Sequence, residues 1–201
     1  MFYEPKDGHG LPHDPLQSCV LPRPIAWISS LSREGVVNLA PYSYFNLVCR
    51  FPPMLMFSSN GRLDAKDTLR NCEDTGEFVV NVATFDNRQK IAATGASMPR
   101  EVDEMAAVGL TPAASSVVAA PGVAESPIRM ECKTHQVVEL PCEDPAYRNA
   151  MVVGTVVGVH IDDEILREGL IDLDKLRPLG RLGYFDYCSV DNAFQIPWKK
   201  S

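Results

Sequence analysis

The 201-residue sequence lacks the signatures of several common protein classes. It has no apolar run near the roughly 20 residues that a membrane-spanning helix requires, so no membrane interaction of that kind is expected. Neither GxGxxG after a strand nor GxxxxGKS or GxxxxGKT occurs, which argues against a Rossmann or P-loop nucleotide-binding domain. The six cysteines include no pair two to four residues apart, so the spacing of a zinc site is also missing and no metal centre is expected.

Positive charge is scarce as well. The chain has 19 Lys and Arg against 26 Asp and Glu, for a formal net charge of -7. Such a surface repels nucleic acids and anionic membranes, so any anionic ligand needs a local cluster of cations. The N-terminal residues contain acid and proline where a secretory signal needs an apolar run, and we expect a cytoplasmic protein. In that reducing compartment the six scattered cysteines are expected to be free thiols.

Segments rich in β-branched and aromatic residues predict at least six strands. They cover residues 25–31, 36–40, 53–59, 77–82, 128–140 and 150–161. Helices are fewer: one has Asp64 as its N-cap and ends at Gly76, a second spans 84–94, and a helix-like piece covers 162–169. Because the strands do not alternate regularly with helices, the sequence predicts a mainly β fold with peripheral helices, built as an antiparallel barrel.

No repeat or linker divides the chain, so residues 1–201 are expected to form a single domain. Residues 1–18 are punctuated by proline and glycine, which predicts an extended arm. Residues 95–127 are a long excursion rich in Ala, Ser and Pro, with room for one short helix. Excursions of this length are usually lids, interface arms or mobile segments. We expect this one to pack over a ligand groove or across a dimer.

The stretch FSSNGRLDAKDTLRN, residues 57–71, is the first candidate site. It predicts a strand, a turn at Asn60 and Gly61, and then the start of a helix, whose unpaired N–H groups and partial positive charge suit a phosphate. The side chains available as donors there are Ser58, Ser59, Arg62, Lys66 and Thr68. Asp67 opposes a phosphate unless it holds a cation. A capped helix with two solvated cations explains the same residues, so that alternative stays open.

Two further segments are candidates for holding a flat polar ring. IAWISSL brings Trp27, Ser29 and Ser30 near a strand end, although a core tryptophan on an ordinary strand is equally consistent. In NLAPYSYFN, residues 38–46, Pro41 predicts a break in the strand, and aromatic and polar side chains alternate after it. The candidate contacts in that segment are Asn38, Ala40, Pro41, Tyr42, Ser43 and Asn46. Aromatic plugs closing a barrel end are the alternative.

Together the three segments would serve one ligand with a flat ring and a phosphate tail, while no signature of nucleophilic catalysis is present. The sequence resembles the flavin reductase-like, FMN-binding split-barrel family, which includes flavoredoxins and the reductase components of two-component monooxygenases. The matching motifs span most of the chain in order: GHGLPHDP, PRPIAWISSL, GVVNLAPYSYFN, PPMLMFSS, KDTLRN, TGEFVVNV, AESPIRMEC, GTVVGVHIDDEI and LRPLGRLGYFDY.

The resemblance implies a split antiparallel β-barrel that forms a homodimer, with FMN in a groove near the interface. The phosphate would meet Ser29 or Ser30 together with Lys66 and Thr68. The ring would rest against residues 38–43, with Asn46 and Ser58 nearby. NADH or NADPH would approach one ring face as a transient co-substrate. Tyr184 stands where many relatives have glycine, which leaves the second substrate open.

Three functions follow as alternatives. The favoured one is an NAD(P)H-dependent flavin reductase without a catalytic side chain of its own, which supplies reduced flavin or electrons to a partner such as a flavin-dependent monooxygenase. The second is a flavoredoxin-like electron carrier with tightly held FMN. The third, outside flavin chemistry, is a structural split barrel with an empty groove.

Overall fold

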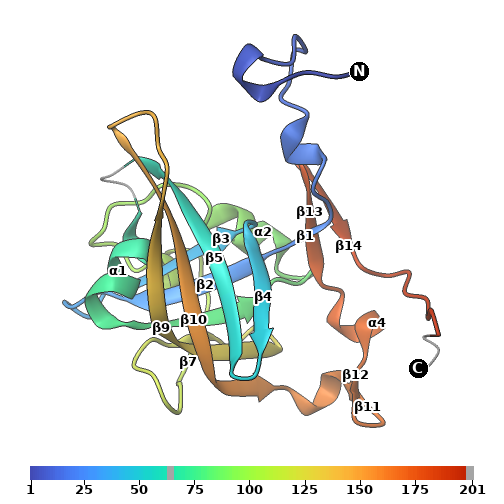
Figure 1. The fold of residues 1–201 in the computed structure, drawn as a ribbon. Coiled ribbons are helices and arrows are strands. Elements are labelled where there is room, and N and C mark those ends of the chain that lie inside the picture. Colours follow the sequence, from blue (N-terminus) through green and yellow to red (C-terminus); the bar gives the residue numbers. More distant parts are fainter. Residues whose placement is uncertain (63–65, 198–201) are drawn as a thin grey trace.

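The computed structural model describes residues 1–62 and 66–197. One antiparallel sheet of seven strands dominates it, in the order β3-β2-β6-β9-β10-β5-β4 (Figure 1). Its strands are β2 (Ala26–Leu31), β3 (Val37–Tyr42), β4 (Phe45–Arg50), β5 (Pro53–Arg62), β6 (Glu77–Val82), β9 (Ile128–Leu140) and β10 (Tyr147–Ile161). The sheet curls. Its two edge strands, β3 and β4, follow each other in the sequence although they lie at opposite ends of the strand order. The predicted mainly β fold is confirmed, and the open edges agree with a split barrel.

Small elements surround this sheet. The helices are α1 (Asp67–Thr75), α2 (Arg88–Ala93), α3 (Glu104–Ala107) and α4 (Leu173–Leu176), with 3-10 turns at Pro5–Asp7, Leu16–Ser18 and Asp163–Ile165. The short strands are β1 (Arg23–Pro24), β7 (Pro112–Ala113), β8 (Gly122–Val123), β11 (Leu166–Arg167), β12 (Leu170–Ile171), β13 (Leu179–Gly183) and β14 (Asp186–Ser189). None of the described helices is both long and apolar enough to cross a membrane.

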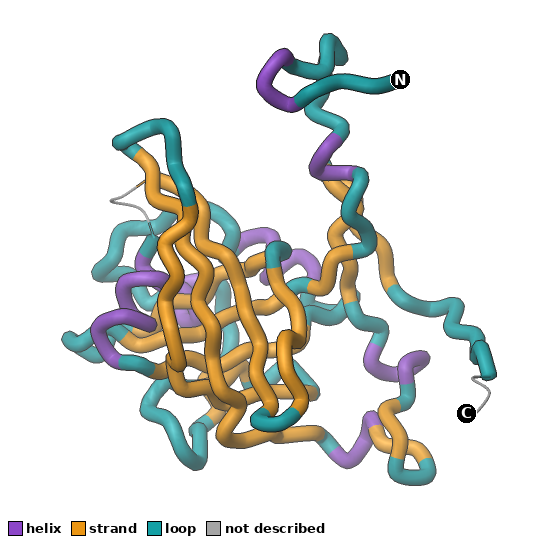
Figure 2. Tube along the Cα trace, in the orientation of Figure 1, coloured by secondary structure: helices purple, strands orange, loops and turns teal. Residues whose placement is uncertain are grey.

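An arm projects from the barrel. Strands β1, β13 and β14 form a separate three-stranded sheet, and the N-terminal residues continue from it away from the barrel (Figures 1 and 2). Arg23 holds the N-terminal segment against β1. The Nη1 of this buried residue donates to the carbonyl oxygens of Gln17 (2.5 Å) and Val20 (2.7 Å).

Two apolar clusters hold the barrel and its helices together. Inside the barrel, Phe57 packs against Tyr42 and Phe78 at ring-centroid distances of 4.8 and 5.5 Å. On the other side of β2, Trp27 and Leu39 pack with side chains from α2, α3 and β13. Strand β2 is therefore covered on both faces, and residues 26–30 are all buried. All six cysteines are free thiols, as the sequence predicts.

Several elements depart from the sequence prediction. Strand β3 continues through Pro41, which pairs with Trp27, so the predicted break is wrong. An edge strand tolerates proline because one row of its backbone groups needs no partner strand. Strand β5 runs on through Asn60 and Gly61 to Arg62, where a turn was predicted, because β10 pairs with it along this stretch. The predicted helix at 162–169 is instead a 3-10 turn followed by a two-stranded hairpin.

The helix predictions hold in part. Helix α1 ends at Gly76, which adopts the left-handed conformation at φ 71°, as predicted. It begins at Asp67 with Lys66 at the N-cap position, while the predicted cap Asp64 lies outside the described residues. Helix α2 is shorter than the predicted 84–94. The excursion 95–127 contains one short helix, α3, as predicted.

Candidate functional site

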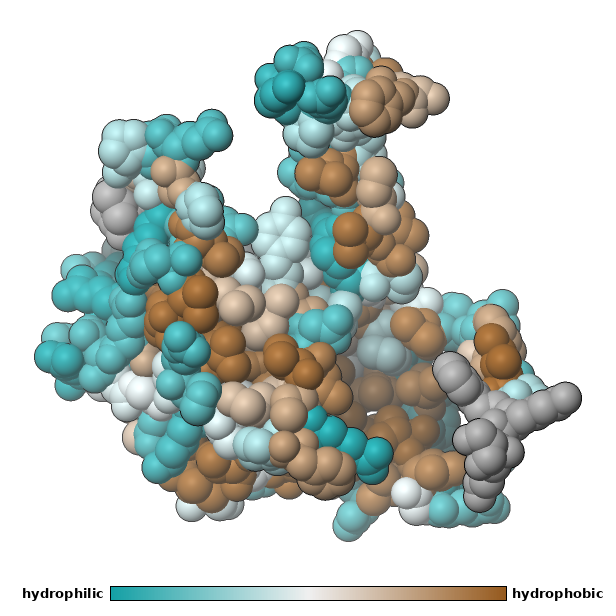
Figure 3. Space-filling model, viewed as in Figure 1, coloured by the Kyte–Doolittle hydropathy of each residue, from teal (hydrophilic) through white to brown (hydrophobic). Residues whose placement is uncertain are grey.

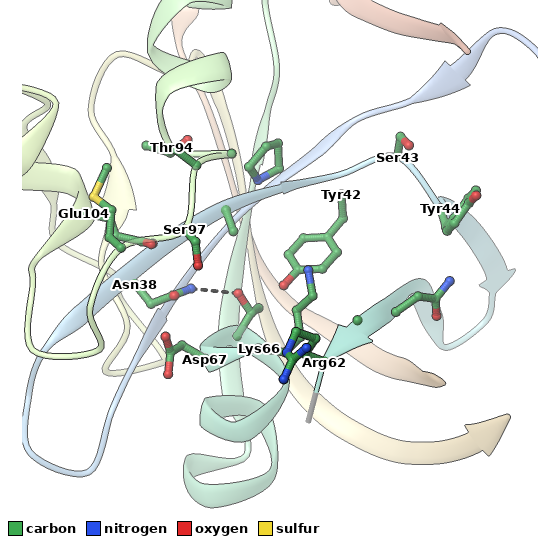
Figure 4. Close-up of a pocket in the computed structure, with 18 of the residues that line it drawn as sticks. Asn38, Tyr42, Ser43, Tyr44, Arg62, Lys66, Asp67, Thr94, Ser97 and Glu104 are labelled. Carbon is green, nitrogen blue, oxygen red and sulfur yellow. Dashed lines mark hydrogen bonds between the residues drawn. The ribbon is translucent and has the colours of Figure 1, made fainter. Parts of the chain in front are cut away.

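A cavity of about 390 Å³ lies where the edge strand β3, the end of β5, the N-terminus of α1 and the segment 94–98 meet (Figure 4). Its volume falls within the range of about 300–1,000 Å³ for small-molecule sites. The predicted residues that line it are Asn38, Ala40, Pro41, Tyr42, Ser43, Ser58, Arg62, Lys66, Asp67 and Thr68. The fold thus joins residues from two of the three candidate segments at one cavity.

Five predicted residues do not reach this cavity. They are Trp27, Ser29, Ser30, Asn46 and Ser59. The hydroxyl of Ser29 donates to the Pro121 carbonyl oxygen at 2.6 Å and accepts from Asn81 Nδ2 at 3.1 Å. Ser29 and Ser30 are fully buried in β2 and do not line the cavity, so their contact with a phosphate stays a prediction.

The other three predicted residues, Trp27, Ser59 and Asn46, also lie outside the cavity. Trp27 donates its indole N–H to Thr94 Oγ1 at 2.9 Å inside the second apolar cluster. Ser59 is buried on the inner side of β5, and Asn46 is exposed on β4, where its Oδ1 accepts from the Leu47 N–H at 2.8 Å. The Ser30 hydroxyl accepts from Asn71 Nδ2 at 3.0 Å.

One end of the cavity is cationic. Arg62 at the end of β5 and Lys66 at the N-cap of α1 both line the cavity, as does Tyr42 (Figure 4). The Lys66 stem crosses Gly61 so closely that a Cβ there would lie 2.3 Å from Lys66 Cε. The first turn of α1 adds unpaired backbone N–H groups and the positive end of its dipole. Two full charges and a helix N-terminus therefore converge in a chain of net charge -7.

The carboxylate of Asp67 is held by a cation, which is the condition under which it would not oppose a phosphate. Arg100 Nη1 lies 2.5 Å from Asp67 Oδ1, and Arg100 Nη2 donates to Asn71 Oδ1 at 3.2 Å. This pairing offsets the negative charge of Asp67 beside the helix N-terminus.

The rings of the segment 38–46 divide between the core and the cavity. Tyr42 is buried against Phe57, and burial raises the pKa of its hydroxyl. Phe45 also packs on the inner cluster. Tyr44 is the exposed ring at the cavity rim, and Arg23 lies over it at 5.6 Å from the ring centroid. Tyr44 is therefore the ring of this segment that is most accessible to a ligand.

The cavity lining also includes residues beyond the predicted contacts. They are Tyr44, Asn60, Gly61, Thr94, Gly95, Ala96, Ser97, Met98 and Glu104. Most belong to the segment after α2, whose small residues carry no local sign of a site. Glu104 is the chemically notable one. Only 7% exposed, it accepts the Leu39 N–H at 2.6 Å and so ties α3 to strand β3.

Burial raises the pKa of Glu104 to about 7, against the opposing effect of the Leu39 N–H, and the nearby Asp67 and Asp103 carboxylates raise it further. Between about pH 4.5 and 7 the folded protein therefore holds a proton that the unfolded chain has released, so this group lowers stability as pH rises through that window.

Replacing Glu104 by Gln removes this titration and keeps an oxygen for the Leu39 N–H. We expect Glu104→Gln to gain stability relative to wild type as pH rises from 4.5 to 7, by about 2 kcal/mol in urea unfolding. The exposed carboxylate of Glu101 offers a matched control, and Glu101→Gln should show no such trend. A constant difference between Glu104→Gln and wild type across this range would contradict the prediction.

The sequence model of the flavin reductase like domain matches residues 18–180. The chain belongs to that family. Nitrilotriacetate monooxygenase component B from Bacillus cereus is 35% identical and superposes with a TM-score of 0.85 over 90% of each chain. The 2-nitrobenzoate 2-nitroreductase of Pseudomonas fluorescens is 29% identical, with a TM-score of 0.81 over 92% of this chain and 88% of its own. An Aquifex aeolicus protein is 41% identical over 82% of each chain. The family match over residues 18–180 includes every residue that lines the cavity.

Proposed function

We propose that this chain binds FMN in the cavity and acts as an NAD(P)H-dependent flavin reductase. The observation that carries the proposal is the pairing of a cationic helix N-terminus with a neutral wall of amide, hydroxyl and aromatic groups. Arg62, Lys66 and Thr68 would hold the phosphate by charge-assisted and hydroxyl hydrogen bonds. The ring would lie against residues 40–44 of the edge strand and its turn.

This chain's residues would bind and orient the flavin and exclude water from one side of it. Strand β3 presents Ala40 and Pro41, whose small and flat surfaces let a ring approach the backbone. Ser43, Ser58 and Asn38 offer hydrogen bonds to its polar edge. When bound, FMN would supply the redox chemistry between a nicotinamide and an electron acceptor, while these residues hold and orient it.

The proposed electron acceptor follows from the similarity to a solved structure. The Bacillus cereus relative is a component of nitrilotriacetate monooxygenase, so we propose that this chain delivers reduced flavin or electrons to a flavin-dependent monooxygenase. We also propose that the protein is cytoplasmic, where its six cysteines would stay reduced.

A homodimer is proposed from the exposed apolar surface. Large apolar side chains are exposed along the arm, on β4 and the turn after it, and on β10, and a hollow separates the arm from the barrel (Figure 3). They include Leu16, Val20, Leu21, Leu47, Val48, Phe51, Val159 and Ile161. Surfaces of this kind usually meet a partner, and we propose that a second copy of this chain covers them. A monomer in sedimentation at micromolar concentration would contradict this.

An absorbance spectrum of the purified protein, followed by NADH and NADPH oxidation with excess FMN, tests the function. A reductase turns over free flavin in the steady state. A flavoredoxin-like carrier instead retains one FMN per chain and turns over slowly. A colourless protein that fails to bind added FMN would leave only a structural barrel.

We further propose that the first part of the excursion, residues 95–104, acts as a lid. Residues 95–98 and Glu104 line the cavity, while Val118 and Ala120 pack on Val79 away from it. FMN should therefore slow tryptic cleavage after Arg100 several-fold. Cleavage after the exposed Arg33, in the turn before β3, serves as the internal control and should not change. Equal cutting after Arg100 with and without FMN would argue against a ligand-linked lid.

A further inference from the structure

The Asn38 side chain sits between Glu104 and Thr68, and its two ends face groups of different character (Figure 4). In one orientation of the amide, Nδ2 donates to Thr68 Oγ1 at 2.7 Å, while Oδ1 faces Glu104 Oε2 at 3.2 Å. With the amide turned over, Nδ2 donates to Glu104 Oε2 at 3.2 Å and Oδ1 accepts from the Thr68 hydroxyl at 2.7 Å. All three residues are at least nine-tenths buried, so each needs its partner.

The protonation state of Glu104 decides between these orientations. An ionised carboxylate only accepts hydrogen bonds, so it requires the Asn38 Nδ2. A protonated carboxyl donates its O–H to Asn38 Oδ1, which turns Nδ2 toward Thr68. In the protonated state Thr68 accepts from Asn38, and its own O–H is released to donate to a ligand in the cavity or to the neighbouring Tyr42 hydroxyl. In the ionised state that O–H is used up on Asn38.

We propose that Glu104, Asn38 and Thr68 form a proton-linked relay, in which Thr68 offers its hydroxyl proton to a bound phosphate only when Glu104 is protonated. The inference rests on the proposed binding of FMN at this cavity. Glu104 and Asn38 act as positioning residues and Thr68 as the contact. At a pH where Glu104 is ionised, FMN binding draws one proton from water onto its carboxylate, and the amide of Asn38 turns over.

Burial first, and then the surrounding charges, favour the protonated form of the Glu104 carboxyl near neutral pH. From its own helix, Asp103 disfavours the ionised form, and from α1 so does Asp67, although Arg100 offsets part of that charge. From β3 the facing group is Tyr42, which stays protonated because burial raises the pKa of its hydroxyl. Burial of the carboxyl itself raises the pKa of Glu104 to about 7, so both states are accessible in the physiological range.

FMN and riboflavin affinities between pH 5.5 and 8.5, measured by quenching of flavin fluorescence, test the relay. Because a phosphate monoester itself loses a proton near pH 6, each variant is compared with wild type at the same pH. Between pH 6 and 8, the FMN affinity of wild type should fall roughly three- to tenfold more than that of Glu104→Gln. This factor corresponds to the loss of one hydrogen bond. Riboflavin, which has no phosphate, should show a smaller difference between the two proteins.

Further variants separate the relay from a direct electrostatic effect of the Glu104 charge on the phosphate. Thr68→Val lacks the hydroxyl, and adding Glu104→Gln to it should no longer change the pH dependence of FMN binding. Glu101→Gln, an exposed carboxylate on the same segment, should behave as wild type. Infrared spectra of the protein without FMN should show a protonated carboxyl band at pH 6 that Glu104→Gln lacks, independently of flavin binding.

The outcomes distinguish the relay from the function on which it rests. Failure of wild type to bind FMN at any pH would overturn the proposed function and the relay together. FMN binding with parallel pH profiles in wild type and Glu104→Gln would overturn the relay alone. An equal pH effect on riboflavin and FMN would also overturn it, because the proton would then act on the ring rather than through Thr68.

Discussion

Replacing Lys66 and Thr68 together by alanine is expected to weaken FMN binding by about 2–4 kcal/mol, or roughly 30- to 900-fold in Kd. Lys66 supplies a full charge at the N-cap of α1, and Thr68 supplies a hydroxyl in its first turn. The loss should fall on the phosphate, so riboflavin affinity should change much less than FMN affinity. Titration of both flavins by fluorescence quenching measures the two effects side by side.

Strand β9 offers a matched control for the loss of a lysine. Lys133 on β9 is about half exposed and contacts Glu77 at 3.9 Å, away from the cavity, so Lys133→Ala should leave both affinities unchanged. Because Thr68 is buried and bonded to Asn38, urea unfolding should first show that the double variant is folded. Unaltered FMN affinity in a folded double variant would refute the phosphate site.

The sequence predicts central strands far better than their ends or edges. Strands β6 and β9 have the predicted bounds, 77–82 and 128–140, and both lie inside the sheet with a paired strand on each side. Local turn chemistry misleads at Asn60 and Gly61, where pairing with β10 overrides the tendency of Asn-Gly to turn. Pro41 misleads for a related reason, since its cost depends on whether β3 has one neighbour or two.

The same limit applies to the site. Charges clustered in one short segment, such as Arg62 and Lys66, can be found from sequence because local geometry brings them together. Glu104 cannot, because nothing local separates it from Glu101 or Asp103. Only the packing of α3 on β3 buries it beside Asn38. Nor does the sequence show that Ser29 is fully buried, since its place in a strand covered on both faces is a property of the whole sheet.

The second half of the excursion is anchored to the barrel by another buried carboxylate, Glu131 on β9. One oxygen accepts the Ser116 N–H at 2.7 Å, and the other accepts those of Val117 and Val118 at 2.6 and 2.9 Å. His160 Nε2 lies 2.5 Å from Oε1. The carboxylate is fully buried and satisfies three consecutive backbone donors. Residues 115–120 are therefore held as a strap on β9, whatever the cavity contains.

Glu131→Ala should destabilise the protein by about 3–5 kcal/mol, because it removes a buried carboxylate that accepts three backbone N–H groups and leaves the buried Val118 N–H without an acceptor. Burial alone would raise the pKa of Glu131, but the strap N–H groups and His160 outweigh it and lower the pKa to about 2. The stabilisation is then present above about pH 4.5 and lost as pH falls toward 2.

Urea unfolding of Glu131→Ala at pH 7 and at pH 3 measures both effects, and the deficit relative to wild type should shrink at the lower pH. Glu143→Ala, at an exposed position in the β9–β10 hairpin, is the control and should unfold like wild type. An equal unfolding midpoint for Glu131→Ala and wild type at pH 7 would mean that the strap contributes nothing to folding. Tryptic cleavage after Arg100 in the folded variant should still respond to FMN, because the strap and the lid make separate contacts with the barrel.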